Sequence, residues 1–406
     1  MDVDGALVRS AVRPGEDPRV RARELQRVRE AALSGARAPQ APRPVIGASW
    51  RRVAGSGLDP GELVEVPPLA VGEVAERRAS SGLEPLWPLL RSSLLPAAES
   101  AGQILVVTDA EGRVLWREGG PSVRRRADAL GFVEGSAWDE LSVGTNAIGT
   151  GLAVGAPVHV YAAEHYAESH QPWTCAAAPL HDPVTGVLLG AVDLSGPAPT
   201  VHPSTVALVE AVARLAEHEL RAAHTSHAER LRTVAAPLLA RLGGRALAVT
   251  DDGCVAAAIG LTPPDQVPLP AGAGGTGSLW LPAFGRCAVE PLPGGWLLRV
   301  EEEEGASVPV RVVLDLTGAR REVRATGAAG DWSVPLTARH ADLLLALARR
   351  PGGSSAAELA TDLFGDPSRT VTVRAEFSRL RRVLGTLLRS QPYRLAEQLT
   401  VEVREV

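Results

Sequence analysis

Stretches rich in proline and glycine interrupt the apolar patterning of this sequence, which restricts it to several folded segments rather than one continuous core. One stretch of Pro, Gly and Ala ends at residue 44, and a second, TPPDQVPLPAGAGGTGSLWLPAFG, covers 262–285. The acidic run Glu301–Glu304 marks a further boundary. With 406 residues and 45% hydrophobic composition, the chain is long enough for at least three modules.

The composition excludes several mechanisms, because the sequence contains no lysine and all 42 basic residues are arginine. A P-loop, a protein-kinase β3 strand and a Schiff-base site each require lysine. The net charge of -5 is small, so any charge-based binding must be local. Cys175, Cys254 and Cys287 are odd in number and lack CxxC spacing, which argues against a disulfide framework or a zinc knuckle.

The N-terminal residues indicate neither export nor a membrane anchor. They are charged and interrupted by Pro14 and Pro18, and no run of about 18 apolar residues occurs in the sequence. We therefore expect a cytoplasmic protein, and no motif predicts a cofactor.

The first half of the chain predicts helices around a sheet. Residues 17–34 have a loosely periodic helical pattern, and 103–117 read as a hairpin. Residues 157–161 and 187–194 are strand-like, the latter typical of a central strand. From Ser204, an N-cap candidate, to residue 232, apolar spacing predicts a long amphipathic helix that closes the domain.

The middle of the chain weakly repeats the first hairpin. LAVTDDGCVAAAIG at 247–260 has the strand, Asp/Gly turn and strand of LVVTDAEGRVL at 105–115. Residues 228–303 then form either a reduced PAS-like or GAF-like module or an extended linker, and the sequence leaves both alternatives open.

The last ninety residues predict short strands, three helices and a hairpin. VRVVLDL, REVRATG and WSVPL are strand-like. The three helices are LTARHADLLLALARRPGG, with Thr337 as N-cap, SSAAELATDLFGDP, capped by Ser354 or Ser355, and RTVTVRAEFSRLRRVLG. SQPYRLAEQLTVEV predicts two short strands around a turn. This order is that of a winged helix-turn-helix, whose third helix enters the major groove.

The charge distribution agrees with a nucleic-acid interface there. Between Asp366 and Arg394, seven arginines stand against two acids, a local charge of +5. Helical spacing predicts that Val373, Phe377, Leu380 and Leu384 pack inward and that Arg374, Ser378, Arg381 and Arg382 lie on the surface. The alternative is an ordinary solvated helix face in an arginine-rich protein.

VPLTARHADLLLALARR, FSRLRRVLG and PYRL resemble the OmpR-type winged-helix domains of bacterial response regulators, over about 308–403. The resemblance implies that Arg374 and Glu376 face the groove, that Arg379 and Arg382 belong to the basic run, and that Arg389 and Arg394 belong to the wing. No receiver domain is recognisable upstream, so phosphorylation is not the expected input. The candidate DNA-binding residues are Arg369, Thr372, Arg374, Glu376, Ser378, Arg379, Arg381, Arg382, Arg389, Tyr393 and Arg394.

IGASWRRVAGSGLDP, LSVGTNAIGTGLAVGAPVHVYAAEHY and WTCAAAPLHDPVTGVLLGAVDLSG resemble the sensory region of activators of acetoin catabolism, over about 40–222. In that family the region contains a GAF domain that senses a small metabolite, and an ATPase then remodels a specialised sigma factor's polymerase. This chain departs from the family there, because a chain without lysine has no Walker A loop. A winged helix stands where the ATPase would be.

The polar residues of the sensory half support a binding pocket or a structural role. The candidate ligand-binding residues are Trp138, Thr145, Asn146, His159, His165, Tyr166, Trp173 and Cys175. GTNAIGTG favours a turn into a helix capped by Asn146 and Thr145 over a phosphate cradle. His159, His165 and His170 with Glu164 match no metal spacing, so no metal is expected. Cys175 is a redox or chromophore site or, more commonly, a buried cysteine. The aromatic residues form a ligand wall or simply core.

We therefore predict an α+β, multidomain protein: an N-terminal helical region 1–84, a GAF sensory domain 85–227, the 228–303 segment and a winged-helix domain 306–406. It would be a one-component transcription regulator, in which an uncharged metabolite alters the 204–232 helix and the spacing of two winged helices in a homodimer on DNA. The alternative is a signalling or scaffold protein whose winged helix binds protein. An enzyme, such as a cyclic-nucleotide phosphodiesterase, is less favoured because no catalytic motif is visible.

Overall fold

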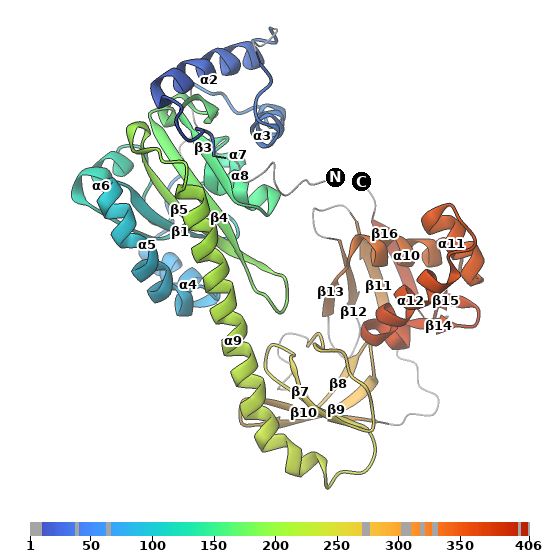
Figure 1. The fold of residues 1–406 in the computed structure, drawn as a ribbon. Coiled ribbons are helices and arrows are strands. Elements are labelled where there is room, and N and C mark those ends of the chain that lie inside the picture. Colours follow the sequence, from blue (N-terminus) through green and yellow to red (C-terminus); the bar gives the residue numbers. More distant parts are fainter. Residues whose placement is uncertain are drawn as a thin grey trace. The chain divides into compact units, whose positions relative to one another are not determined.

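The computed structural model describes residues 10–36, 40–61, 66–269, 277–301, 310–316, 321–326, 332–396 and 399–404. The chain divides into two compact units, Met1–Ala223 and His224–Val406 (Figure 1). Most of the expected acidic boundary at 301–304 lies outside the described residues. Across the described ranges, every helix is too short or too polar to span a lipid bilayer.

An antiparallel five-stranded sheet organises the first unit. Its strands are β1 (Ile104–Asp109), β2 (Val114–Gly119), β3 (Val158–Tyr161), β4 (Trp173–His181) and β5 (Leu188–Pro197), in the order β2-β1-β5-β4-β3. The expected hairpin at 103–117 is confirmed as β1 and β2, and the expected central strand as β5.

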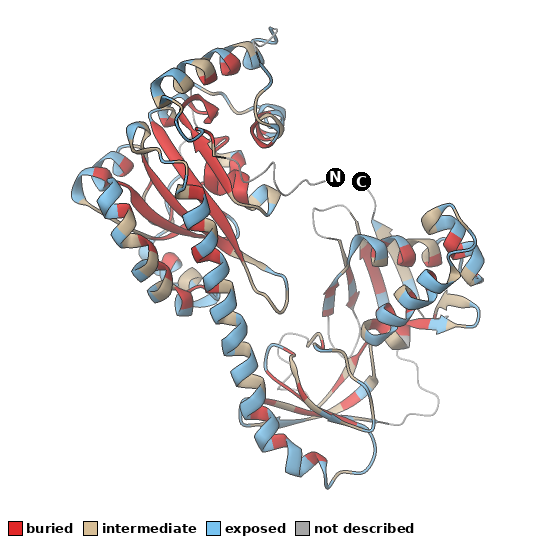
Figure 2. Ribbon diagram, viewed as in Figure 1, coloured by how far each residue is buried: buried red, intermediate tan, exposed pale blue. Residues whose placement is uncertain are grey.

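Helices cover both faces of this sheet. They are α2 (Pro18–Leu33), α3 (Pro44–Gly55), α4 (Val71–Ser80), η1 (Glu84–Leu86), α5 (Trp87–Ala101), α6 (Pro121–Asp128), α7 (Glu140–Val143), α8 (Ala147–Val154), η2 (Ala162–Glu164), η3 (Glu168–His170) and η4 (Ala198–Thr200). On one face, α5 and the start of α9 pack on the sheet, and on the other α3, α6 and α8 pack on it. The strands between these layers are almost entirely buried (Figure 2).

The long helix α9 (Thr205–Leu239) extends seven residues beyond the expected end at 232. Its first half buries Val206 and Val209 in the first unit, and its last turns bury Leu231, Ala235 and Leu239 against the second unit's first sheet. The apolar residues of these last turns pack on the second sheet, and their burial stabilises the helix beyond residue 232.

The middle segment forms a second antiparallel five-stranded sheet rather than an extended linker. Its strands are β6 (Ala246–Val249), β7 (Val255–Ile259), β8 (Ser278–Leu281), β9 (Gly285–Leu292) and β10 (Gly295–Val300). Their order, β7-β6-β10-β9-β8, is that of the first sheet when strands are numbered from the start of each. The similar sequences at 105–115 and 247–260 therefore form the equivalent hairpins of two sheets that have the same strand order.

The last segment combines a four-stranded sheet with three helices and a hairpin. The sheet contains β11 (Val310–Asp315), β12 (Glu322–Thr326), β13 (Trp332–Pro335) and β16 (Leu399–Arg404). The helices are α10 (Ala338–Ala348), α11 (Ala356–Phe364) and α12 (Thr370–Leu384), followed by η6 (Gly385–Leu387) and the hairpin strands β14 (Leu388–Ser390) and β15 (Tyr393–Leu395). Thr337 caps α10, and of the two candidate serines Ser355 caps α11.

The hairpin differs from its prediction. The turn at Gln391 and Pro392 joins Tyr393–Leu395 to the preceding Leu388–Ser390, and the expected second strand, TVEV, belongs instead to β16. That strand pairs in parallel with β11, from Val310–Leu399 to Asp315–Arg404. A pairing between segments about 90 residues apart has no local sequence signal, because period-two alternation identifies a strand and not its neighbour.

Candidate functional site

The stretch that contains GTNAIGTG is a tightly packed turn between α7 and α8. Asn146 caps α8, accepting a hydrogen bond from the Gly149 N–H at 2.9 Å, as expected. Its Nδ2 donates to the carbonyls of Trp138 and Gly144 at 3.1 and 2.9 Å. A Cβ added to Gly149 would lie 2.6 Å from the Glu140 nitrogen, so this glycine permits close backbone packing.

Thr145 does not cap the helix, contrary to expectation. Its hydroxyl lies 2.6 Å from the Ser49 hydroxyl of α3 and is fully buried. Because Asn146 already occupies the N-cap, the Thr145 hydroxyl can join α3 to the turn. Both residues therefore have structural partners within the unit.

The eight expected ligand-binding residues are all buried, with exposures between 0 and 7%. Trp138, Tyr166, Trp173 and Cys175 belong to the apolar core that includes α3, α6 and α8. The Tyr166 hydroxyl donates to the Leu58 carbonyl at 3.0 Å. Burial to this degree means that a ligand would reach these side chains only through a cleft.

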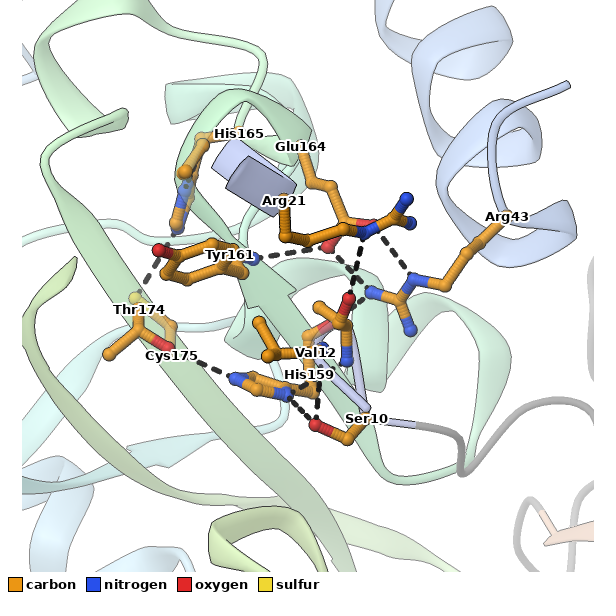
Figure 3. Close-up of polar contacts among 12 residues, drawn as sticks. Ser10, Val12, Arg21, Arg43, His159, Tyr161, Glu164, His165, Thr174 and Cys175 are labelled. Carbon is orange, nitrogen blue, oxygen red and sulfur yellow. Dashed lines mark hydrogen bonds and ion pairs between the residues drawn. The ribbon is translucent and has the colours of Figure 1, made fainter. Parts of the chain in front are cut away.

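His159 is occupied by protein contacts on both ring nitrogens (Figure 3). Nδ1 accepts from the Ala11 N–H and contacts the Ser10 hydroxyl, both at 3.1 Å, and Nε2 lies 3.0 Å from the Thr174 hydroxyl. Burial, together with the nearby Arg43 charge, lowers the pKa of His159 to about 3. The neutral ring thus holds the segment before α2 against β3.

His165 and Cys175 form a neutral buried pair. His165 Nε2 lies 3.4 Å from Cys175 Sγ, and Nδ1 lies 3.0 Å from the Ala162 carbonyl. Burial lowers the pKa of His165 to about 3 and raises the pKa of the Cys175 thiol. The pair therefore lacks the thiolate of a reactive cysteine, which favours the structural interpretation of Cys175.

An ion pair fixes the N-terminal helices to the loop after β3 (Figure 3). Arg43 Nε and Nη2 donate to the two carboxylate oxygens of Glu164, each at 2.7 Å, and Oε2 also accepts from the Tyr161 N–H at 3.1 Å. Trp50 Nε1 donates to the Glu164 carbonyl, and Arg29 Nη2 donates to the Tyr166 carbonyl. The Glu164 carboxylate is thus paired and not available as a metal ligand.

A cleft of about 410 Å³ opens beside Trp138 and His170. The two rings are stacked with centroids 4.9 Å apart, and Phe132 packs behind Trp138 at 3.9 Å. The remaining described lining residues are Val66, Pro67, Pro68, Ala129, Leu130, Gly131, Val133, Ser136, Ala137, Ser142, Val143 and Ser169. None of these described side chains is charged. The volume is that of a small-molecule site.

His170 lines this cleft and has a buried ring nitrogen. It is 3% exposed, and its Nδ1 has no hydrogen-bond partner among the described residues. Burial lowers its pKa to about 4, so the ring is neutral at pH 7. A neutral imidazole offers a donor or an acceptor to a ligand without adding charge. Of the eight expected ligand-binding residues, Trp138 lines the cleft; His170 was considered only as a metal ligand.

Asp193 is a second buried polar group, and it was not among the residues expected from the sequence. It lies on β5, two residues before Ser195, whose hydroxyl donates to its Oδ2, and its Oδ1 has no partner among the described residues. Burial raises the pKa of Asp193 to about 8. The available signal was the polar i, i+2 pair within VDLSG, in an otherwise apolar central strand.

In the second unit, α12 separates its residues as helical spacing predicts. Val373, Phe377, Leu380 and Leu384 are 0 to 2% exposed. The exposed residues of the expected DNA-binding set are Arg369, Thr372, Arg374, Ser378, Arg379, Arg381, Arg382 and Arg389, whereas Glu376, Tyr393 and Arg394 are half-buried. The exposed arginines therefore lie on α12, at its N-cap and on β14, and Arg374, Arg381 and Arg382 among them line a cleft together with loops of the second sheet.

The half-buried members of this set have structural partners. Glu376 pairs with His340 of α10 at 3.3 Å and with Arg379 at 2.6 Å, and the ring of Tyr393 packs edge-on against Phe377. Arg381 Nη1 lies 3.4 Å from the Ser390 hydroxyl, which joins α12 to the hairpin. These contacts hold the hairpin beside the exposed face of α12.

The first unit and the chain as a whole both resemble known proteins. The N-terminal domain family of MimR matches residues 21–217, which include all five strands of the first sheet. An uncharacterized 47.3 kDa protein in the thcA 5' region of Rhodococcus erythropolis is 30% identical over 405 residues, covering 98% of this chain and 74% of its own. The chain belongs to the same family as that protein.

Other relatives match only part of this chain. The acetoin dehydrogenase operon transcriptional activator AcoR of Bacillus subtilis is 41% identical over 129 residues, 32% of this chain and 21% of AcoR. The propane 2-monooxygenase operon transcriptional activator MimR of Mycolicibacterium goodii is 31% identical over 200 residues, 49% of this chain and 33% of MimR. This chain thus shares a third or less of the length of these two activators.

Proposed function

We propose that this protein is a transcription regulator that binds DNA through its last segment in response to a small neutral molecule bound in the first unit. The observation that carries the proposal is α12: its apolar residues are buried, its arginines are exposed, and a hairpin lies beside it. A winged helix over 306–406 would place this helix in the major groove. The partially matching relatives, both transcriptional activators, support regulation of transcription.

The sensory half of the proposal rests on the Trp138 and His170 cleft. A GAF domain over 85–227 would bind the effector there, with the aromatic pair as an apolar wall and His170 Nδ1 as the polar anchor. A charged effector would find no opposite charge among the described lining residues, and its desolvation would be uncompensated. A neutral molecule with a carbonyl or hydroxyl group fits this chemistry.

The two halves would communicate through α9, which packs in the first unit at Val206 and Val209 and in the second at Leu231 and Ala235. A ligand that favours one packing of the first half shifts the population of states available to the second. A homodimer, also proposed here, would set the spacing of two DNA-binding segments. Light scattering of the full chain that gives a monomer with and without DNA would refute the dimer.

Salt dependence of duplex binding tests the DNA-binding half. Substitution of Arg381 and Arg382 by alanine should weaken binding of a fluorescent duplex, and the slope of log affinity against log salt should fall by about 0.9 for each phosphate that is no longer neutralised. Arg324→Ala, on β12 and paired with Glu322, is the matched control. An unchanged slope in the double variant would refute α12 as the interface.

A further inference from the structure

Three side chains of types that can ligate a metal ion meet where α9 passes the β6–β7 turn. His224 is on α9, and Asp252 and Cys254 belong to the turn. His224 Nδ1 lies 2.6 Å from Asp252 Oδ2, Cys254 Sγ lies 3.7 Å from the same oxygen, and one donor atom from each residue lies within 4.8 Å of the others. The spacing of the cysteines in the sequence argues against a zinc knuckle. A site that combines one cysteine with a histidine and an aspartate leaves no such spacing in the sequence.

The separations are close to those of a tetrahedral site. Ligand bonds of about 2.0–2.1 Å to nitrogen or oxygen and about 2.3 Å to sulfur give distances of about 3.3–3.7 Å between donors. The contact between the sulfur and the carboxylate already has this length, and the imidazole and carboxylate need to separate by about 0.7 Å. Asp252 is exposed, so a fourth position is open to water.

The equivalent hairpin of the first sheet shows what these residues replace. There, Arg77 of α4 pairs with Asp109 and Glu111 at 2.7 and 2.8 Å, which anchors a helix to the β1–β2 turn without a thiol. When the turns are aligned on the shared Gly, Arg113 of the first corresponds to Cys254 of the second; the carbonyl of each accepts the equivalent backbone hydrogen bond, from the Asp109 and Thr250 N–H groups. The second turn therefore carries a thiol, Cys254, although the first turn shows that an ion pair alone can hold a helix to such a turn.

We propose that His224, Asp252 and Cys254 bind a thiophilic divalent cation such as Zn²⁺, which cross-links α9 to the β6–β7 turn. On binding, the Cys254 thiol releases its proton to solvent, and the thiolate and the Asp252 carboxylate together neutralise the charge of the ion. The soft sulfur donor selects against Mg²⁺ and Ca²⁺, which prefer oxygen ligands. The bound ion would make the helix and the hairpin one rigid element.

Titration of the full chain with Co²⁺ tests the site. The expected result is one equivalent bound, a thiolate-to-cobalt charge-transfer band in the near ultraviolet, visible bands of tetrahedral intensity, and loss of both on addition of Zn²⁺. Cys254→Ser should abolish the charge-transfer band, whereas Cys287→Ser, at a buried cysteine of β9, should retain it. His224→Gln should weaken Co²⁺ binding by at least about tenfold.

A wild-type chain without the charge-transfer band would overturn the proposal, as would a band that persists in Cys254→Ser. If that variant fails to fold, as judged by circular dichroism, the Co²⁺ affinity of Asp252→Asn is measured instead. Because Asp252 is an exposed residue and asparagine keeps an Oδ1 acceptor for the Thr250 hydroxyl, the variant should fold. Weaker Co²⁺ binding by Asp252→Asn supports the site, and unchanged binding overturns it.

Discussion

Replacing Arg43 with methionine should loosen the N-terminal helices from the sensory sheet. The substitution leaves the Glu164 carboxylate buried, and the Tyr161 N–H is then its remaining partner within the described part of the chain, since Arg43 supplies both ion-pair contacts found there. The side chains of Arg43 and Glu164 are 15 and 2% exposed, so solvent screens the pair little. Removing one partner of a buried pair costs about 3–5 kcal/mol.

Hydrogen exchange measured by mass spectrometry locates this destabilisation. At about 1.4 kcal/mol per factor of ten, this cost corresponds to exchange about 100-fold to 4000-fold faster in Arg43→Met. The effect is expected for those amides of α3 and β3 that exchange when this ion pair opens. Arg91→Met is the matched control: Arg91 pairs with Glu118 at an exposed position, and no measurable change is expected.

A second substitution separates charge from packing. In the Arg43→Met background, Glu164→Gln removes the unpaired charge but keeps an acceptor for the Tyr161 N–H. Part of the lost protection should return. Equal exchange in Arg43→Met and Arg91→Met would refute a role for this ion pair in holding the N-terminal helices in place.

Two further substitutions test the buried polar groups. Burial raises the folded-state pKa of Asp193 from 3.8 to about 8, so its contribution to stability is complete below about pH 4 and is lost as the pH rises toward 8. Asp193→Asn should therefore flatten this part of the pH profile of the unfolding free energy measured in urea. An unchanged profile would contradict an ionisable Asp193. His170→Phe keeps a ring against Trp138 but removes Nδ1, so its affinity for a neutral ligand found by thermal-shift screening should fall about 2–10-fold. The control His202→Phe, at an exposed position, should leave the affinity unchanged. Equal affinities of the two variants would exclude His170 as the anchor.

The sequence predicted elements whose periodicity is local. The inward face of α12 and the β1–β2 hairpin follow from side-chain spacing, because a helix or hairpin brings together residues a few positions apart. The Asn146 cap was likewise predictable, since the cap and the N–H that donates to it are three residues apart.

Features that depend on distant segments were not predicted. The parallel pairing of β16 with β11, the meeting of His224 with Asp252 and Cys254, and the position of His170 at the cleft each depend on tertiary packing. The polar character of 141–166 indicated a site, but most of those polar groups bond to neighbouring protein, as buried groups generally must. Residue type alone does not distinguish such groups from one that faces a cleft.

The most direct test of the proposed function is selection of bound sequences from a random duplex pool by the full chain, at about 100 mM salt to suppress non-specific phosphate binding. We expect an enriched half-site, and loss of that enrichment when Arg381 and Arg382 are both replaced by glutamate. Enrichment that survives the double replacement would contradict α12 as the reading helix. Failure of both the full chain and residues 306–406 to enrich any sequence would contradict DNA binding by this segment.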